Sequence, residues 1–179
     1  MTEYKLFIPP EHLAEKGRKN WNKKEAEEYK EWLLSVIDNR ISNLLNFFNE
    51  QESNDDIHKF LLRLSKKVSN KLNESGFSAE IKGQKKLTNM GYALAADMGL
   101  LIAKYLLRDC GNKLYWTIIR KPKSEMSYNL PVLEIKGFDY YEPVGVSISD
   151  ATSIINDNKD YDVWLKVYNF IKDNCSSHK

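Results

Sequence analysis

Residues 93–107, ALAADMGLLIAKYLL, are the stretch that decides the fold. Apolar side chains follow one another through almost all of it, which predicts a helix that is buried on nearly every side. Thr88 or Asn89 would cap the start of this helix, and Gly111 would end it. We therefore expect the other elements to pack around this helix, and the acid within it, Asp97, needs an explanation.

Two explanations of Asp97 follow from the spacing. Asp97 lies on the same side of its helix as Lys104 and Arg108, so these three residues could form a narrow solvated stripe. The alternative involves Arg40, which projects from the middle of the apolar face of another predicted helix. A buried guanidinium group needs a carboxylate or several carbonyls to offset its lost hydration. We predict a buried ion pair between Arg40 and Asp97.

Three further helices follow from periodic apolar patterns. Asn22 and Glu25 have the spacing of a capping box, and the helix that they open carries an apolar face over residues 26–48. A second helix, residues 57–75, follows two aspartates that suit its positive end. The last pattern, residues 160–174, is the closing helix. Its apolar face is formed by Tyr161, Trp164, Leu165, Tyr168 and Ile171.

The period changes in the second half of the chain. LYWTIIR (114–120), VLEIKGF (132–138) and PVGVSIS (143–149) are short and rich in β-branched and aromatic residues, so they predict strands. Residues 77–86 suit a short strand and a loop. Connections this short join antiparallel strands. We expect a single domain, residues 1–179, of the α+β class: a helical N-terminal half packed on an antiparallel sheet of about three to four strands, with a closing C-terminal helix.

The composition is that of an ordinary globular protein. Hydrophobic residues make up 42% and charged residues 29%, and the net charge of +2 gives no argument for nucleic acid or a membrane as a partner. The first ten residues do not resemble a secretory signal, so we expect a cytoplasmic protein. Residues 90–107 are interrupted by Asp97 and Lys104 and fall short of the length that spans a bilayer. We therefore expect a core helix and no membrane association.

Neither a metal nor a cofactor is expected. His12, His58 and His178 stand alone, without metal-ligand spacing, and the common hydrolase and nucleotide-binding motifs are absent from the sequence. Cys110 and Cys175 are expected to be free thiols. A Cys110 nucleophile activated by His58 can be imagined, but inert packing is the favoured interpretation. No catalytic residue is predicted.

The helix at residues 57–75 has a basic side. No acid occurs between Ile57 and Leu72, and this geometry could follow a phosphate backbone. No aromatic residue is interleaved on that side for base stacking. A solvated helix face is the favoured interpretation, and nucleic acid is not the expected partner. The basic residues are Lys59, Arg63, Lys66, Lys67 and Lys71.

The segment from residue 127 to residue 143 is the predicted contact surface for a protein partner. Tyr128 and Asn129 lie in a predicted exposed turn, while Tyr140 and Tyr141 lie at a strand end. Tyrosine anchors interfaces at low entropy cost. Adjacent strand residues face opposite ways, so one of Tyr140 and Tyr141 can be buried and the other exposed. The alternative, in which the tyrosines complete the core, fits the pattern equally well.

Three stretches carry a family resemblance. They are EAEEYKEWLLSVIDNRISNLL (25–45), ALAADMGLLIAKYLL (93–107) followed by LYW, and SYNLPVLEIKGFDYYEPV (127–144). With their Arg-Ile helix, Asp-x-Gly helix, Trp strand and Asn-x-Pro-Val-Leu, they resemble a loose family of small bacterial proteins of unknown or toxin-immunity function. The chain departs from this pattern at Leu130, where the resemblance implies a polar residue. The resemblance implies a cytoplasmic protein that binds and neutralises a toxin, and it carries over no catalytic residue.

Two main hypotheses of function compete. The first is a non-catalytic protein-binding module, most concretely an immunity protein that neutralises a bacterial toxin. The second is a nucleic-acid-associated or regulatory protein that uses the basic helix, and an enzyme without a recognisable motif is a third. An inhibitor that covers the basic site of a nuclease is usually acidic, so a chain with a net charge of +2 favours a toxin that is not a nuclease.

Overall fold

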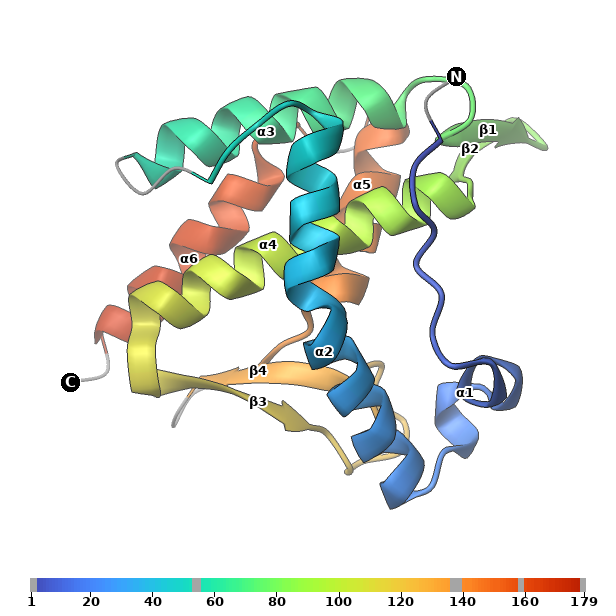
Figure 1. Ribbon diagram of the computed structural model, residues 1–179, viewed down its shortest axis with the longest axis vertical. Coiled ribbons are helices and arrows are strands. Elements are labelled where there is room, and N and C mark those ends of the chain that lie inside the picture. Colours follow the sequence, from blue (N-terminus) through green and yellow to red (C-terminus); the bar gives the residue numbers. More distant parts are fainter. Residues whose placement is uncertain (1–2, 53–55, 136–139, 158–159, 178–179) are drawn as a thin grey trace.

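A computed structural model of the chain describes residues 3–52, 56–135, 140–157 and 160–177 (Figure 1). The long helix α4, Asn89–Cys110, runs through the middle of the molecule, and 15 of its 22 residues are buried. The Thr88 side chain accepts a hydrogen bond from the Gly91 N–H at its start, and Gly111 follows its end with a φ of 57°. The predicted central helix is confirmed.

Helix α4 also has the length and composition of a membrane span. The stretch Asn89–Lys113 meets both criteria, so the expectation that it is too short for a bilayer is wrong. Within the most apolar 18-residue stretch of this helix, 78% is buried inside the protein, which is typical of a core helix.

The helices that pack around α4 are α2 (Lys23–Phe47), α3 (Ile57–Leu72), α5 (Pro143–Ile155) and α6 (Val163–Ser177). The short helix α1 (Glu11–Lys16) instead packs through Leu13 against Trp21 and Ala26, near the start of α2. Short 3₁₀ turns lie at Arg18–Asn20 and Gly111–Lys113. Helix α2 crosses one side of α4, and α5 and α6 also contact α4 directly. The capping box at the start of α2 is present, because Asn22 accepts from the Glu25 N–H and Glu25 accepts from the Asn22 N–H.

Helix α5 approaches α4 closely at small residues. A methyl group built on Gly99 would lie 2.1 Å from the Pro143 carbonyl oxygen, so α4 can touch α5 there only because Gly99 has no side chain. The Ser147 hydroxyl of α5 donates to the Ala95 carbonyl at 2.6 Å and accepts from the Trp164 indole at 2.8 Å. These contacts join α4, α5 and α6 into one layer of the core.

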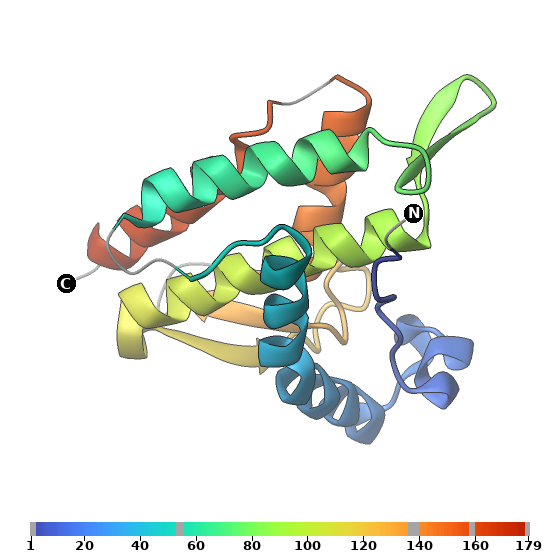
Figure 2. The same cartoon turned by 45° about the horizontal axis from the view of Figure 1, so that its top comes forward.

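The strands form two small antiparallel sheets. Strands β1 (Ser78–Ile81) and β2 (Gln84–Leu87) make a hairpin that projects from the body, as Figure 2 shows. Strands β3 (Leu114–Ile118), β4 (Pro131–Ile135) and β5 (Tyr140–Tyr141) form the second sheet in that order. The α+β class is therefore confirmed, with a helical N-terminal half, antiparallel sheets and a closing C-terminal helix α6.

The strand predicted at residues 143–149 is wrong, because this segment begins helix α5. Glu142 caps the helix: its two carboxylate oxygens accept from the N–H groups of Val144 and Gly145, and Pro143 occupies the first helical position. The alternating β-branched residues imitate a strand, but capping and burial against α4 select a helix. The third strand is β5, directly before the cap. Residues 136–138 of the second predicted strand lie outside the described residues.

Candidate functional site

The predicted ion pair between Arg40 and Asp97 is present. The Arg40 Nε and Nη2 atoms donate to the two oxygens of Asp97, both at 2.8 Å. The side chain of Asp97 is fully buried, so the solvated stripe is wrong; Lys104 instead pairs with Glu52 at 2.8 Å. Tyr4 OH also donates to Asp97, at 2.6 Å.

This ion pair fixes the N-terminal segment of the protein. Arg40 donates to the carbonyl oxygens of Lys5 and Leu6, both at 2.9 Å. Burial raises the pKa of Asp97 to about 6, against the opposing effects of Arg40 and Tyr4, so the carboxylate is charged at neutral pH. Every polar atom of the pair thus serves to hold helices and segments together, and its role is structural.

Tyr128 and Asn129 are wrongly predicted as exposed contact residues. Both are buried. The Asn129 side-chain amide donates to the carbonyl oxygens of Arg18 and Trp21, at 2.7 and 2.9 Å, and its oxygen accepts from Arg120. Asn129 therefore anchors the loop before β4 to the start of α2, and neither residue is available to a partner.

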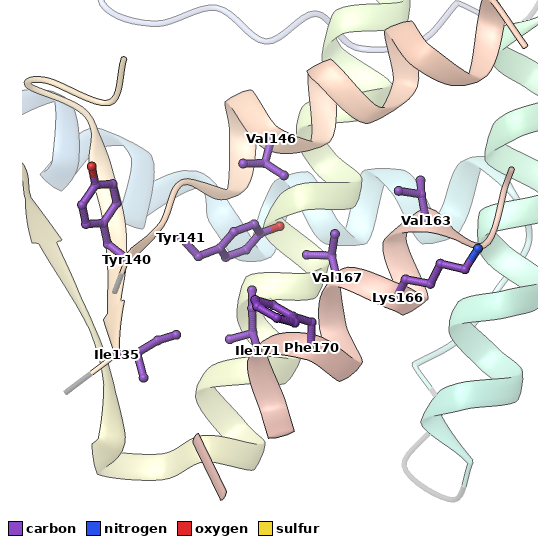
Figure 3. A pocket seen from close by; sticks show the side chains of 9 residues that line it. All are labelled: Ile135, Tyr140, Tyr141, Val146, Val163, Lys166, Val167, Phe170 and Ile171. Atoms are coloured by element: carbon purple, nitrogen blue, oxygen red, sulfur yellow. The ribbon is translucent and has the colours of Figure 1, made fainter. Parts of the chain in front are cut away.

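Tyr140 and Tyr141 border an open apolar hollow of about 450 Å³, which we call the β5–α6 groove. In Figure 3, Tyr141 points toward Val146 and Val167, whereas Tyr140 turns away from them, as adjacent strand residues should. Tyr141 is buried, and Tyr140 is 37% exposed. The described lining residues are Ile135, Tyr140, Tyr141, Val146, Val163, Lys166, Val167, Phe170 and Ile171.

Phe170 is the most exposed aromatic side chain at this groove. It is 64% exposed, on helix α6. Among the described lining residues the charged one is Lys166, whose ammonium group pairs with Asp162 at 2.8 Å. The groove is therefore suited to apolar side chains and offers little to a polar substrate.

Sequence patterns identified only part of this groove. Tyr140 and Tyr141 were predicted, but Phe170 and Val146 were not. The sequence pattern places Val146 in a strand, and of the apolar face that it predicts for the closing helix, Ile171 is the member among the described lining residues. A signal for the second face exists, since Val163, Val167 and Phe170 recur at helical spacing.

The basic side of α3 is largely neutralised by acids. Arg63 and Lys67 share Glu50, at 2.9 and 2.6 Å. Lys59 pairs with Asp56 at 2.9 Å and Lys71 with Glu74 at 2.6 Å. These contacts fit the preferred interpretation of a solvated helix face.

Cys110 and His58 do not lie together as a catalytic pair. His58 shares a hydrogen bond with Asn169, at 2.8 Å. Burial and the neighbouring Cys175 thiol raise the pKa of Cys110 well above its usual value, so the thiol stays protonated at neutral pH. Both cysteines are free, and no cluster of three or more metal-binding side chains occurs in the part of the chain that the structure describes.

Glu142 is a half-buried acid at the start of α5. Burial raises the pKa of its carboxyl group to about 7, although the α5 N–H groups and Arg18 oppose the shift. The carboxyl group lines a small cavity of about 170 Å³ with Arg18 and Tyr29. A carboxyl group with this pKa could exchange protons at neutral pH. Both of its oxygens are already occupied by the N–H groups of α5, so its evident task is to cap that helix.

Comparisons of the chain with protein-family models, with curated proteins and with solved structures found no match.

Proposed function

We propose that this protein is a non-catalytic binding protein that holds another protein at the β5–α6 groove. The observation that carries the proposal is the exposed ring of Phe170, together with the half-exposed Tyr140, beside an open apolar hollow. Aromatic residues around such a hollow are the usual anchors of protein interfaces. The matching surface on the partner is an apolar or aromatic side chain that fills the groove.

The energetics of the groove favour this occupant. An apolar side chain would contact Val146 and Val167 without removing water from an unpaired charge, because Lys166 already pairs with Asp162. Full burial of one such side chain stabilises a complex by about 1.5 to 3 kcal/mol. Phe170 and Tyr140 would lose exposed apolar area in the same event, which adds to this gain.

The partner class that we propose is a toxin made by the same bacterium. This part of the proposal rests on the resemblance of the α2, α4 and β3–β5 regions to immunity-type proteins. The net charge of +2 favours a toxin whose active site is not strongly basic, because an inhibitor of a basic site is usually acidic.

Co-expression with the product of each neighbouring gene tests the proposal. We expect one product to be toxic alone and to be rescued by this protein. Phe170→Asp should abolish rescue and complex formation, because it places a charge at the centre of the contact. Met126→Asp is the matched control, because Met126 is 80% exposed on the loop between β3 and β4, outside the groove, and it should leave rescue unchanged.

The proposal fails if no neighbouring product is both toxic and rescued. It also fails if folded Phe170→Asp protein, verified by circular dichroism, binds and rescues as well as the original chain.

A further inference from the structure

Two cavities lie on the other side of α5 from the β5–α6 groove and share Tyr92 as a wall. The first, of about 350 Å³, lies between the N-terminal segment and helices α4 and α5. The second, of about 620 Å³, lies beside strand β2 and the end of α5. We call the pair the Tyr92 cleft. The Tyr92 ring between the two cavities is 45% exposed, so one elongated ligand could lie across this ring and reach both.

One face of α5 runs the length of this cleft. Val144 and Ile148 line the first cavity, and Thr152 lines the second. These residues are spaced by four positions, so they project from the same side of the helix. Asn156, directly after α5, lines the far end. The cleft thus changes along one helix from apolar to polar.

The apolar end of the cleft has exposed walls that are held in place. Leu6 is 41%, Ile8 70% and Tyr92 45% exposed. Arg40 holds the carbonyl oxygens of Lys5 and Leu6, which fixes the segment that carries two of these side chains. An exposed apolar wall that is already ordered loses little entropy when a ligand covers it.

The polar end carries positive charge without a paired acid. Among the described residues that line the cleft, the charged ones are Lys85 and Lys86. The Lys85 ammonium group donates to the neutral Asn73 side chain at 3.2 Å. Glu80 lies directly opposite Lys85 in the hairpin, yet the described residues provide no ion pair for either Lys85 or Lys86. The lysines of α3, in contrast, are mostly paired with acids.

We propose that the Tyr92 cleft binds a free amphiphile: a hydrocarbon chain that ends in a carboxylate or phosphate group. The hydrocarbon chain lies in the first cavity, against Val144 and Ile148. The anionic head group lies in the second cavity, beside the projecting hairpin (Figure 2). Lys85 and Lys86 both line this cavity, although they leave strand β2 on opposite faces, because lysine side chains are long and flexible. The charge complementarity selects an anion, and the apolar volume selects a chain that a small anion such as phosphate lacks. This site is separate from the proposed protein contact.

Matched probes of opposite charge test the site. Isothermal titration calorimetry would compare dodecanoate with dodecyltrimethylammonium, each below its micelle concentration, and with acetate. We expect dodecanoate to bind at least roughly tenfold more tightly than the cation, and acetate not to bind, because both the chain and the charge are needed.

Variants locate the binding. Lys85→Gln with Lys86→Gln should weaken dodecanoate binding by roughly tenfold or more, whereas Lys66→Gln on α3 should not change it. Tyr92→Glu should abolish binding by placing a negative charge at the shared wall, and Tyr92→Phe should preserve it. Tyr92 is half exposed, so both variants should fold, and thermal unfolding would verify this.

Three results would overturn the proposal. The first is equal binding of the anionic and cationic probes, or no binding of either. The second is unchanged dodecanoate affinity in the double lysine variant. The third is binding to phosphatidylglycerol vesicles without binding to monomeric dodecanoate, which would assign the lysines to a membrane surface instead.

Discussion

At the scale of single residues, Asp97 does the most to organise the molecule. Its carboxylate accepts from Arg40 of α2 and from Tyr4 of the N-terminal segment, while the residues next to it in α4, Ala93–Ala96 and Met98–Ala103, are apolar and buried. Arg40 in turn uses its other donors on backbone carbonyls. One buried charge pair therefore sets how α2 crosses α4 and where the N-terminal segment lies.

We predict that Asp97→Asn destabilises the protein by about 3 to 5 kcal/mol, because it leaves the buried Arg40 charge without a carboxylate. Urea denaturation would measure the free energy of unfolding. Lys59→Gln is the control, since it breaks an exposed pair with Asp56 and should cost about 1 kcal/mol or less. If Asp97→Asn lowered the free energy of unfolding by less than the control variant does, the ion pair would not stabilise the core.

Glu142 predicts a pH dependence of stability. Its pKa is about 7 in the folded protein, against an ordinary value of 4.5, so within this interval the folded state binds a proton that the unfolded state releases. The free energy of unfolding should therefore fall as the pH rises from 4.5 to 7. Asp97 should likewise lower the free energy of unfolding as the pH rises from 3.8 to about 6, because its pKa is also raised in the folded protein.

The two carboxyl groups can be separated by measuring between pH 6 and pH 7, above the pKa of Asp97. Urea unfolding of Glu142→Gln should show a flatter pH dependence there than the original chain. The exposed Glu80→Gln variant should keep the original slope. An unchanged slope in Glu142→Gln would contradict the assignment of this proton to the cap of α5.

At the scale of elements, helix α3 shows why a row of cations is not by itself a binding surface. Glu50 lies beyond the end of α2 and was outside the helical pattern that suggested the basic side. It nevertheless reaches both Arg63 and Lys67. Hydrogen bonds from Arg63 and Lys67 hold the pKa of Glu50 at about 2, although burial opposes the shift, so this acid stays charged at neutral pH.

We therefore predict no detectable binding of α3 to duplex DNA or RNA at physiological salt, as measured by fluorescence anisotropy. Changing Lys59, Lys66 and Lys71 to glutamine should leave the anisotropy titration unchanged. Micromolar affinity that weakens steeply with salt, and that disappears in this triple variant, would reverse the conclusion.

At the scale of the whole molecule, helix α5 separates two surfaces of different chemistry. Val146 faces the β5–α6 groove, and Val144 and Ile148 face the Tyr92 cleft. The groove carries exposed aromatic rings, and the cleft carries an apolar wall and unpaired lysines. The two sites share the helix but no described lining residue.

We predict that the two sites act independently. Phe170→Asp should leave dodecanoate affinity unchanged, and the double lysine variant should leave partner binding unchanged, because substitutions without shared contacts act additively. Calorimetry on both variants would measure this. Coupling by more than roughly threefold in either direction would show that α5 links the sites.

The sequence by itself determined the features that depend on local pattern and on unsatisfied charge. The apolar run over residues 93–107 was sufficient to predict the central helix, because apolar side chains on every side can be buried only at the middle. Arg40 and Asp97 could be paired from their positions in apolar helix faces, because each charge is too costly to bury without a partner. The capping box at Asn22 was equally local.

Tertiary structure decided the rest. Residues 143–149 become a helix that packs closely on α4 because Gly99 has no side chain, and the strand-like alternation does not report this contact. The Glu142 cap of this helix is a local signal that the alternation hides. Tyr128 and Asn129 are buried because their loop packs against a segment that is far away in the chain. The carbonyl oxygens of Arg18 and Trp21 in that segment accept hydrogen bonds from the Asn129 side chain. The groove and the cleft each join side chains from several elements, and no periodicity within one element reports such a hollow.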